Sequence, residues 1–186
     1  MNPILLNLPE SFDTERLTLR CPRPGDGLEL NRAIRESWAE LQPWMPFAKG
    51  ELPSVETNEA FVRAKYAEFL QRSDMMLMAF LKGTHTFAIA TGLHPRDWDV
   101  PSFEIGYWCR TAYAGHGYVT ESTRAITAFG FDVLKARRIV IRADTRNMRS
   151  RAVAERCGFT LEGILRNDAV DNQSVPRDTA FYAQVR

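Results

Sequence analysis

Two glycines flank a histidine in the segment YAGHGYVTE, residues 113–121, between a strand-like run and a helix-like run. Glycine adopts positive φ at no steric cost, so Gly115 and Gly117 let a ligand approach the main chain closely. The helix that follows would offer unpaired N–H groups and the positive end of its dipole. These features predict a phosphate-binding site. The two glycines alone are also consistent with a tight surface turn, which remains the alternative.

Two familiar phosphate-binding loops are excluded by the residues after these glycines. A Walker loop requires G-x-x-x-x-G-K-[ST], and no lysine follows Gly117. A dinucleotide fingerprint requires G-x-G-x-x-G, and Thr120 stands where its third glycine would be.

A second polar motif follows downstream, in the segment NMRSRAVAERCGF, residues 147–159. Asn147 is a good N-cap for a short helix, and Ser150 is tolerated in a first turn. Capping is therefore the alternative to a chemical role for this pair, and Gly158 ends the predicted helix.

The hydrophobic pattern predicts the elements that must position both motifs. Strands 103–109 and 137–144 should be parallel because a helix separates them, and ligands bind at the carboxyl ends of such strands. We expect strands over 15–23, 75–81, 84–93, 103–109, 137–144, 159–165 and 177–185, helices over 26–41, 54–70, 119–136 and 148–158, and a loop over 94–102.

The composition is that of an ordinary globular protein, with 186 residues, 45% hydrophobic, 25% charged and a formal net charge of +1. We expect one domain over residues 1–186, with no overall attraction to nucleic acid or membranes. Cys21, Cys109 and Cys157 are widely spaced, which argues against a disulfide framework or a metal site. With no signal-peptide pattern, the expected location is cytoplasmic.

The motifs in their order resemble the GNAT N-acetyltransferase superfamily, and more closely its RimJ/RimL branch. The segments that carry the resemblance are TERLTLR, QPWMPF, FEIGYW, GHGYVTE, NMRS and ERCGF, and it extends from about Thr14 to the C-terminus. It implies an α/β fold whose central mixed sheet is mostly antiparallel, with about seven strands and helices on both faces. It also implies acetyl transfer from acetyl-CoA to a primary amine, with a protein N-terminus favoured.

The glycine loop departs from the family pattern at both ends. Ala114 stands where the family usually has Gln or Arg, and Val119 stands where it has Gly or Ala. The backbone amides from His116 to Val119 can still cradle a pyrophosphate, and the His116 side chain is more simply a loop filler. The resemblance implies that acetyl-CoA contacts Tyr107, Trp108, Gly115, His116, Gly117, Tyr118, Val119, Asn147 and Arg151, with Asn147 on the pantetheine arm.

Eight basic residues lie between Lys135 and Arg156, against only Asp144 and Glu155. A solvated charged face is the simple interpretation, and the functional one is that Arg151 or a neighbour meets the 3′-phosphate of the nucleotide. Nucleic-acid binding is the rival interpretation, but the chain has no known reader motif and the remaining residues cancel the charge.

Acetyl transfer needs a neutral amine, a polarised carbonyl and a protonated leaving thiolate. At neutral pH about a tenth or more of an α-amine is unprotonated, against about one part in a few thousand of a lysine amine. Glu104 resembles the family's base position and would act through water. Ser150 resembles the position that protonates the thiolate, and a backbone N–H of Gly106–Trp108 would polarise the carbonyl.

The acceptor pocket is expected from the first two helices and their linker, with Trp38, Trp44 and Met45 as contacts. Two alternatives stay open beside the protein N-terminus. One is a small-molecule acceptor such as an antibiotic, a polyamine or an amino acid, and the other is a non-catalytic acyl-CoA-binding regulatory module. The sequence does not decide the oligomeric state.

Overall fold

The computed structural model describes residues 2–186, and within that range it has five α-helices and eight strands. No helix in that range is both long and apolar enough to cross a lipid bilayer. The helices are α1 (Gly27–Glu36), α2 (Trp38–Leu41), α3 (Val55–Gln71), α4 (Tyr118–Asp132) and α5 (Met148–Arg156). The strands are β1 (Ser11–Asp13), β2 (Leu17–Arg20), β3 (Met75–Leu81), β4 (Phe87–Asp97), β5 (Ser102–Cys109), β6 (Arg138–Asp144), β7 (Thr160–Val170) and β8 (Pro176–Val185).

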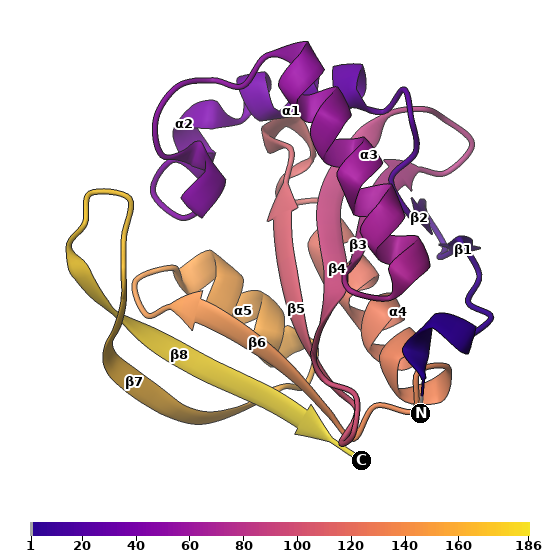
Figure 1. Ribbon diagram of the computed structural model, residues 1–186. Helices are drawn as coiled ribbons and strands as arrows, with labels where there is room; N and C mark the ends of the chain where they lie inside the picture. Colours follow the sequence, from indigo (N-terminus) through magenta and orange to yellow (C-terminus); the bar gives the residue numbers. More distant parts are fainter. Residues whose placement is uncertain (1) are drawn as a thin grey trace.

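The strands form one mixed sheet in the order β1-β2-β3-β4-β5-β6-β8-β7 (Figure 1). All neighbours are antiparallel except β5 and β6, which are parallel as the crossover through α4 predicts. The expectation of seven strands is wrong by one, because β1 adds a three-residue strand at the edge. So short a strand carries no alternation that a sequence pattern can reveal.

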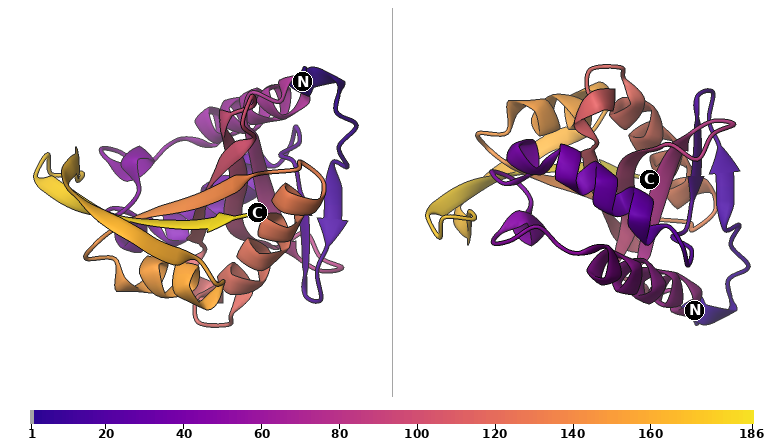
Figure 2. Two further views of the ribbon diagram at one scale, coloured as in Figure 1. Left: turned by 90° about the horizontal axis from the view of Figure 1, so that it is seen from below. Right: turned by 90° about the horizontal axis from the view of Figure 1, so that it is seen from above.

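Helices cover both faces of the sheet, as expected. Figure 2 shows α1 and α3 on one side and α4 and α5 on the other. Alternating side chains of the strands supply both interfaces. Ile105 of β5 lies in the same buried cluster as Ile126 of α4, whereas Trp108 lies with Ile34 of α1.

Two of the expected boundaries that differ do so because of contacts with other parts of the chain. The predicted helix over 26–41 breaks at Ser37, whose backbone is not helical and whose Oγ accepts the Thr111 N–H at 2.9 Å. The loop predicted over 94–102 is shorter in the structure, because β4 continues to Asp97. A register shift between Pro95 and Asp97 accommodates the proline in the strand.

The sheet opens between β5 and β6. Their ladder has three pairs and ends at Glu104 and Val140. Beyond that level β5 pairs only with β4 as far as Cys109, and β6 pairs only with β8 as far as Asp144. The carboxyl ends of the two strands diverge visibly in Figure 1. Backbone groups that face this gap therefore lack a ladder partner.

Candidate active site

The glycine loop has the backbone that the sequence predicts. Gly115 and Gly117 have φ of +81° and +82°, in the left-handed region that favours glycine. Gly117 is the N-cap of α4 and, having no side chain, makes no side-chain cap. Internal bonding of the helix begins with the Glu121 N–H on the Gly117 carbonyl at 3.0 Å. The N–H groups of the first turn are thus left for another acceptor.

The N-terminal segment of the chain holds this loop in place. Arg16 donates through Nη1 to the His116 carbonyl at 3.0 Å and through Nε to Glu121 Oε2 at 2.7 Å. Thr14 Oγ1 donates to Glu121 Oε1 at 2.6 Å. Burial raises the pKa of Glu121, but these bonds outweigh it, so the net pKa is lowered and the carboxylate stays charged. The His116 ring stacks on Tyr118 and its Nδ1 lies 3.0 Å from the Ala114 carbonyl.

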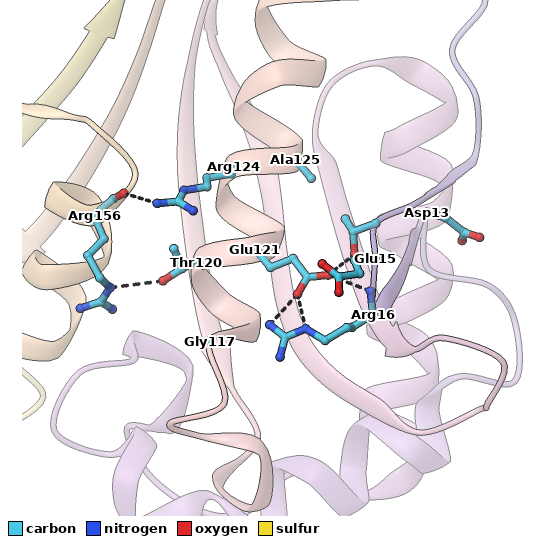
Figure 3. Close-up of a pocket in the computed structure, with 10 residues that line it drawn as sticks. Asp13, Glu15, Arg16, Gly117, Thr120, Glu121, Arg124, Ala125 and Arg156 are labelled. Carbon is cyan, nitrogen blue, oxygen red and sulfur yellow. Dashed lines mark hydrogen bonds and ion pairs between the residues drawn. The ribbon is translucent and has the colours of Figure 1, made fainter.

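A pocket of about 720 Å³ lies beside this loop (Figure 3). Arg156 Nε donates to Thr120 Oγ1 at 3.4 Å, and Arg124 Nη2 donates to the Arg156 carbonyl at 2.8 Å. Within residues 2–186 neither guanidinium forms an ion pair with a carboxylate. The pocket therefore offers two guanidinium groups without an ion-pair partner next to the first turn of α4, and the carboxylates of Asp13 and Glu15 also line it.

Asn147 and Ser150 lie on the far side of the gap, at the start of α5. Asn147 Oδ1 accepts the Ser150 N–H at 3.0 Å, which confirms the capping interpretation. Ser150 also meets β5, because Tyr107 Oη donates to its carbonyl at 2.9 Å and its Oγ donates to Tyr107 Oη at 3.2 Å. Burial raises the pKa of Tyr107 to about 12, so this phenol stays protonated at neutral pH.

Strand β5 presents different groups to its two faces and to the gap. Phe103 and Ile105 are buried, as the alternation predicts. The Arg110 N–H bonds the Ala88 carbonyl on β4, so alternation turns the backbone of Tyr107 away from β4 and toward the gap. The Trp108 side chain is buried against Phe87, and the same alternation turns its backbone toward Ala90 of β4, so neither faces the gap.

Glu104 lies on the same face of β5 as Trp108, and two arginines hold it. Arg96 Nη1 donates to Oε2 at 3.0 Å and Arg142 Nε donates to Oε1 at 2.9 Å. The carboxylate is 21% exposed. Both of its oxygens are therefore engaged by guanidinium groups from the neighbouring strands.

A family model described as acetyltransferase (GNAT) domain matches residues 16–160. The chain belongs to the GNAT acetyltransferase family. The putative ribosomal N-acetyltransferase YdaF of Bacillus subtilis (strain 168) is 27% identical over 172 residues, 92% of each chain. The ribosomal-protein-serine acetyltransferase of Escherichia coli (strain K12) is 34% identical over 87 residues, 44% of this chain and 45% of that protein.

Solved structures of this GNAT type share the whole fold. The microcin C7 self immunity acetyltransferase MccE, in complex with acetyl-CoA and AMP, has a TM-score of 0.87 at 24% identity and covers 96% of this chain and 98% of its own. RimL with coenzyme A has a TM-score of 0.86 at 23% identity, with 95% and 98% covered. The RimJ/RimL-like resemblance, acetyltransferase activity and acetyl-CoA as the donor are confirmed by the family and these relatives.

The residues of the glycine loop and of the pocket beside it fit acetyl-CoA, the donor of GNAT enzymes. A Cβ built on Gly115 would have nothing within 4 Å, so the loop is open to a ligand, and Gly117 meets only the tip of Arg16. The uncapped first turn of α4 suits a pyrophosphate, and Arg124 and Arg156 suit a further phosphate. Arg151, the residue expected at the 3′-phosphate, instead donates to Tyr182 Oη at 3.0 Å and to the Thr145 carbonyl at 3.2 Å.

The expected acceptor residues lie around the break between α1 and α2 and in the turn after α2. Trp44 is 40% exposed, while Trp38 and Met45 are half-buried against the core. The turn between β7 and β8 reaches this segment, because Asn172 Nδ2 donates to the carbonyls of Gln42 at 2.6 Å and Met45 at 2.8 Å. This contact ties the β7–β8 turn to the segment around α2, near which the turn lies in Figure 1.

Sequence reasoning missed three residues at this site. Arg16 and Glu121 support the glycine loop although about a hundred positions separate them in the sequence. Arg124 lines the pocket but lies outside the run of basic residues between Lys135 and Arg156. The spacing of Thr120 and Arg124, one helical turn apart after the glycines, was the available signal.

Proposed function

We propose that this GNAT enzyme acetylates the α-amine of a protein N-terminus. The tie from Asn172 to the α2 segment is the observation that supports this acceptor, because it narrows the approach on one side to a slender chain end. Lys49 Nζ adds a second link, to Ser174 Oγ at 3.3 Å. The relatives named as ribosomal-protein acetyltransferases point the same way.

The protonation of the acceptor favours the same choice. An α-amine has a pKa near 7.7–8.0, so a useful fraction is neutral at physiological pH. A lysine amine, with a pKa near 10.4, needs a stronger base. The carboxylate on this face, Glu104, is already bonded to two arginines, which suits a less demanding amine.

In this proposal the donor lies along the gap between β5 and β6. The backbone of Gly115, His116, Gly117, Tyr118 and Val119 holds the pyrophosphate, and Asn147 borders the pantetheine arm. The Tyr107 N–H, which faces the gap, polarises the carbonyl oxygen. Ser150 Oγ and the Tyr107 hydroxyl supply the proton or hydrogen bond for the departing sulfur.

The acceptor side completes the assignment. Trp38, Trp44 and Met45 form one wall and the β7–β8 turn forms the other. The amine loses its proton on the face of β5 that carries Glu104. This residue stands at the base position that the family resemblance indicates, and His94 of β4 is its cross-strand neighbour. The cytoplasmic location expected from the sequence remains a prediction.

The experiment measures release of free coenzyme A thiol from acetyl-CoA with matched acceptors. One peptide has a free N-terminus and no lysine, its partner has a blocked N-terminus and one internal lysine, and a panel of polyamines, amino acids and aminoglycosides completes the set. The proposal expects turnover of the free N-terminus and little of the lysine peptide. Preference for the lysine peptide or a small amine would overturn the acceptor, and binding without any turnover would favour the non-catalytic module.

A further inference from the structure

Three polar residues form a row across the sheet beside the proposed reaction site. His94 of β4 is the direct cross-strand partner of Glu104 on β5, so the two side chains share a face. Leu93 pairs with Met75, the first residue of β3, which brings Asp74 alongside His94. The row therefore continues from Glu104 through His94 to Asp74.

Asp74 fixes the His94 ring. Its Oδ1 lies 2.5 Å from His94 Nδ1, and its Oδ2 accepts from Lys65 Nζ at 2.8 Å. Lys65 also donates to Glu68 at 2.7 Å. Burial raises the pKa of Asp74, but the bonds from His94 and Lys65 outweigh it and lower the pKa to about 2. A carboxylate in this position fixes the neutral ring as the Nδ1–H tautomer.

The other ring nitrogen is available. Among residues 2–186 His94 Nε2 has no hydrogen-bond partner, and the side chain is 41% exposed. A Cβ built on Gly106 would lie 3.4 Å from Nε2, so the absence of a side chain there keeps the nitrogen open. Gly106 immediately precedes Tyr107, whose backbone faces the gap. The free lone pair thus lies beside the residue that precedes the N–H assigned above to the acetyl carbonyl.

We propose that His94, oriented by Asp74, accepts the proton that the acceptor amine must lose. The inference rests on the proposed amine acetylation and names the residue that performs one of its steps. The ammonium gives one proton to Nε2 and becomes a neutral amine, and its nitrogen forms the new bond to the acetyl carbon. When the carbon–sulfur bond breaks, the second amine proton goes to the sulfur, and His94 returns its proton to solvent through its exposed edge.

The charges around His94 suit this role. Asp74 stabilises the imidazolium, and Lys65 keeps Asp74 in place, with Glu68 balancing the lysine charge. Across the strand, Glu104, Arg96 and Arg142 together carry one net positive charge, and Asp74, Lys65 and Glu68 together carry one net negative charge. The two groups cancel, and the negative group lies on the side of His94, where it stabilises the imidazolium. An aspartate, a histidine and an open nitrogen are the parts of a positioned general base.

The first test compares two histidine variants in the full chain. His94→Gln removes the base, and His85→Gln changes an exposed histidine in the β3–β4 turn as a control. The pH profile of kcat/KM is measured with the best amine found. We expect His94→Gln to lose roughly a hundredfold at pH 7 and to recover about tenfold near pH 9, because about a tenth of an α-amine is already neutral at pH 7. His85→Gln should follow the wild type.

An active wild type whose profile is parallel to that of His94→Gln would overturn this inference while leaving the proposed acetylation intact. If no amine is acetylated by the wild type, the proposed function itself fails. A second measurement needs no acceptor, since ¹⁵N chemical shifts in the full chain report the neutral tautomer of His94. We expect Nδ1–H and a bare Nε2. An Nε2–H tautomer would overturn the assignment whatever the activity.

Discussion

The hydroxyl of Tyr107 on β5 and the backbone and side chain of Ser150 on α5 bond to each other across the gap between β5 and β6. The tyrosine donates to the serine carbonyl at 2.9 Å, and the serine Oγ donates to the phenol oxygen at 3.2 Å. Two hydroxyl groups from opposite walls thus meet where the strands separate. Either one can turn its proton toward a negative charge that forms in the gap.

Ser150→Ala is the first prediction. If Ser150 supports the leaving thiolate, kcat should fall roughly ten- to a hundredfold while acetyl-CoA affinity changes little, because the contact strengthens only as charge develops. Steady-state kinetics and calorimetric titration with acetyl-CoA separate the two effects. Ser54→Ala is the matched control, since Ser54 Oγ caps α3 far from the gap. An unchanged kcat in Ser150→Ala would leave Ser150 as a helix residue only.

Gly117→Val is the second prediction. A β-branched residue is strained at φ of +82° and would distort the loop that presents the first-turn N–H groups. We expect acetyl-CoA affinity to fall more than tenfold, or by about 1.4 kcal/mol or more. Gly83→Val carries the same strain at φ of +74° in the exposed β3–β4 turn, and should cost stability without weakening acetyl-CoA. Equal calorimetric affinities of the two folded variants for acetyl-CoA would contradict a phosphate-binding site at the glycine loop.

Local patterns predicted the centre of this fold well. The order of β5, glycine loop, α4 and β6 followed from periodicity and two glycines, and a crossover helix made the two strands parallel. The three-residue β1 and the continuation of β4 through Pro95 were not predictable in this way, because pairing with neighbours creates them. Ser37 breaks a helical pattern through a bond to Thr111, a partner distant in sequence.

The same distinction between local patterns and long-range contacts applies to the residues of the site. Gly115, Gly117 and the Asn147 cap act through their own backbone neighbourhood, so residue type and spacing were enough to find them. The side-chain partners of Arg151 and Glu104 come from other strands, and no local pattern shows them. Long-range contacts therefore decide which charged residues are free to bind a ligand.

Arg156→Ala, the third prediction, follows from the unpaired guanidinium groups in the pocket beside α4. We expect it to weaken acetyl-CoA by roughly five- to tenfold and the dephospho form, which lacks the 3′-phosphate, by much less. Arg151→Ala is the comparison, because this arginine bonds Tyr182 and Thr145 within the protein. Isothermal titration with both donors decides between them. If only Arg151→Ala weakens acetyl-CoA more than the dephospho form, Arg151 and not Arg156 binds the 3′-phosphate.

The fourth prediction concerns stability against pH at Asp74. Its pKa is lowered from 3.8 to about 2 in the folded protein, so folding favours the ionised form. That stabilisation, about 2 kcal/mol, is present above about pH 4 and is lost as the pH falls toward 2. Urea unfolding of Asp74→Asn should thus show a deficit at pH 7 that shrinks below pH 4. Asp99→Asn, at an exposed aspartate, should show none.

The last prediction separates Glu104 from His94. Glu104→Gln leaves Arg96 and Arg142 without their carboxylate, so two positive charges face the incoming amine. Repulsion of about 1 kcal/mol at high dielectric should raise KM for the cationic acceptor roughly fivefold, and added salt should reduce the effect. Asp132→Asn is the control, because it frees Arg186 beside Phe131 of α4, on the other face of the sheet. With His94 intact, kcat of Glu104→Gln should keep the wild-type dependence on pH, whereas the rise in KM should fade toward pH 9 as the amine loses its charge. If instead Glu104→Gln lowers kcat at pH 7 with recovery by pH 9, and the profile of His94→Gln stays parallel to the wild type, Glu104 is the base acting through water and His94 is its neighbour.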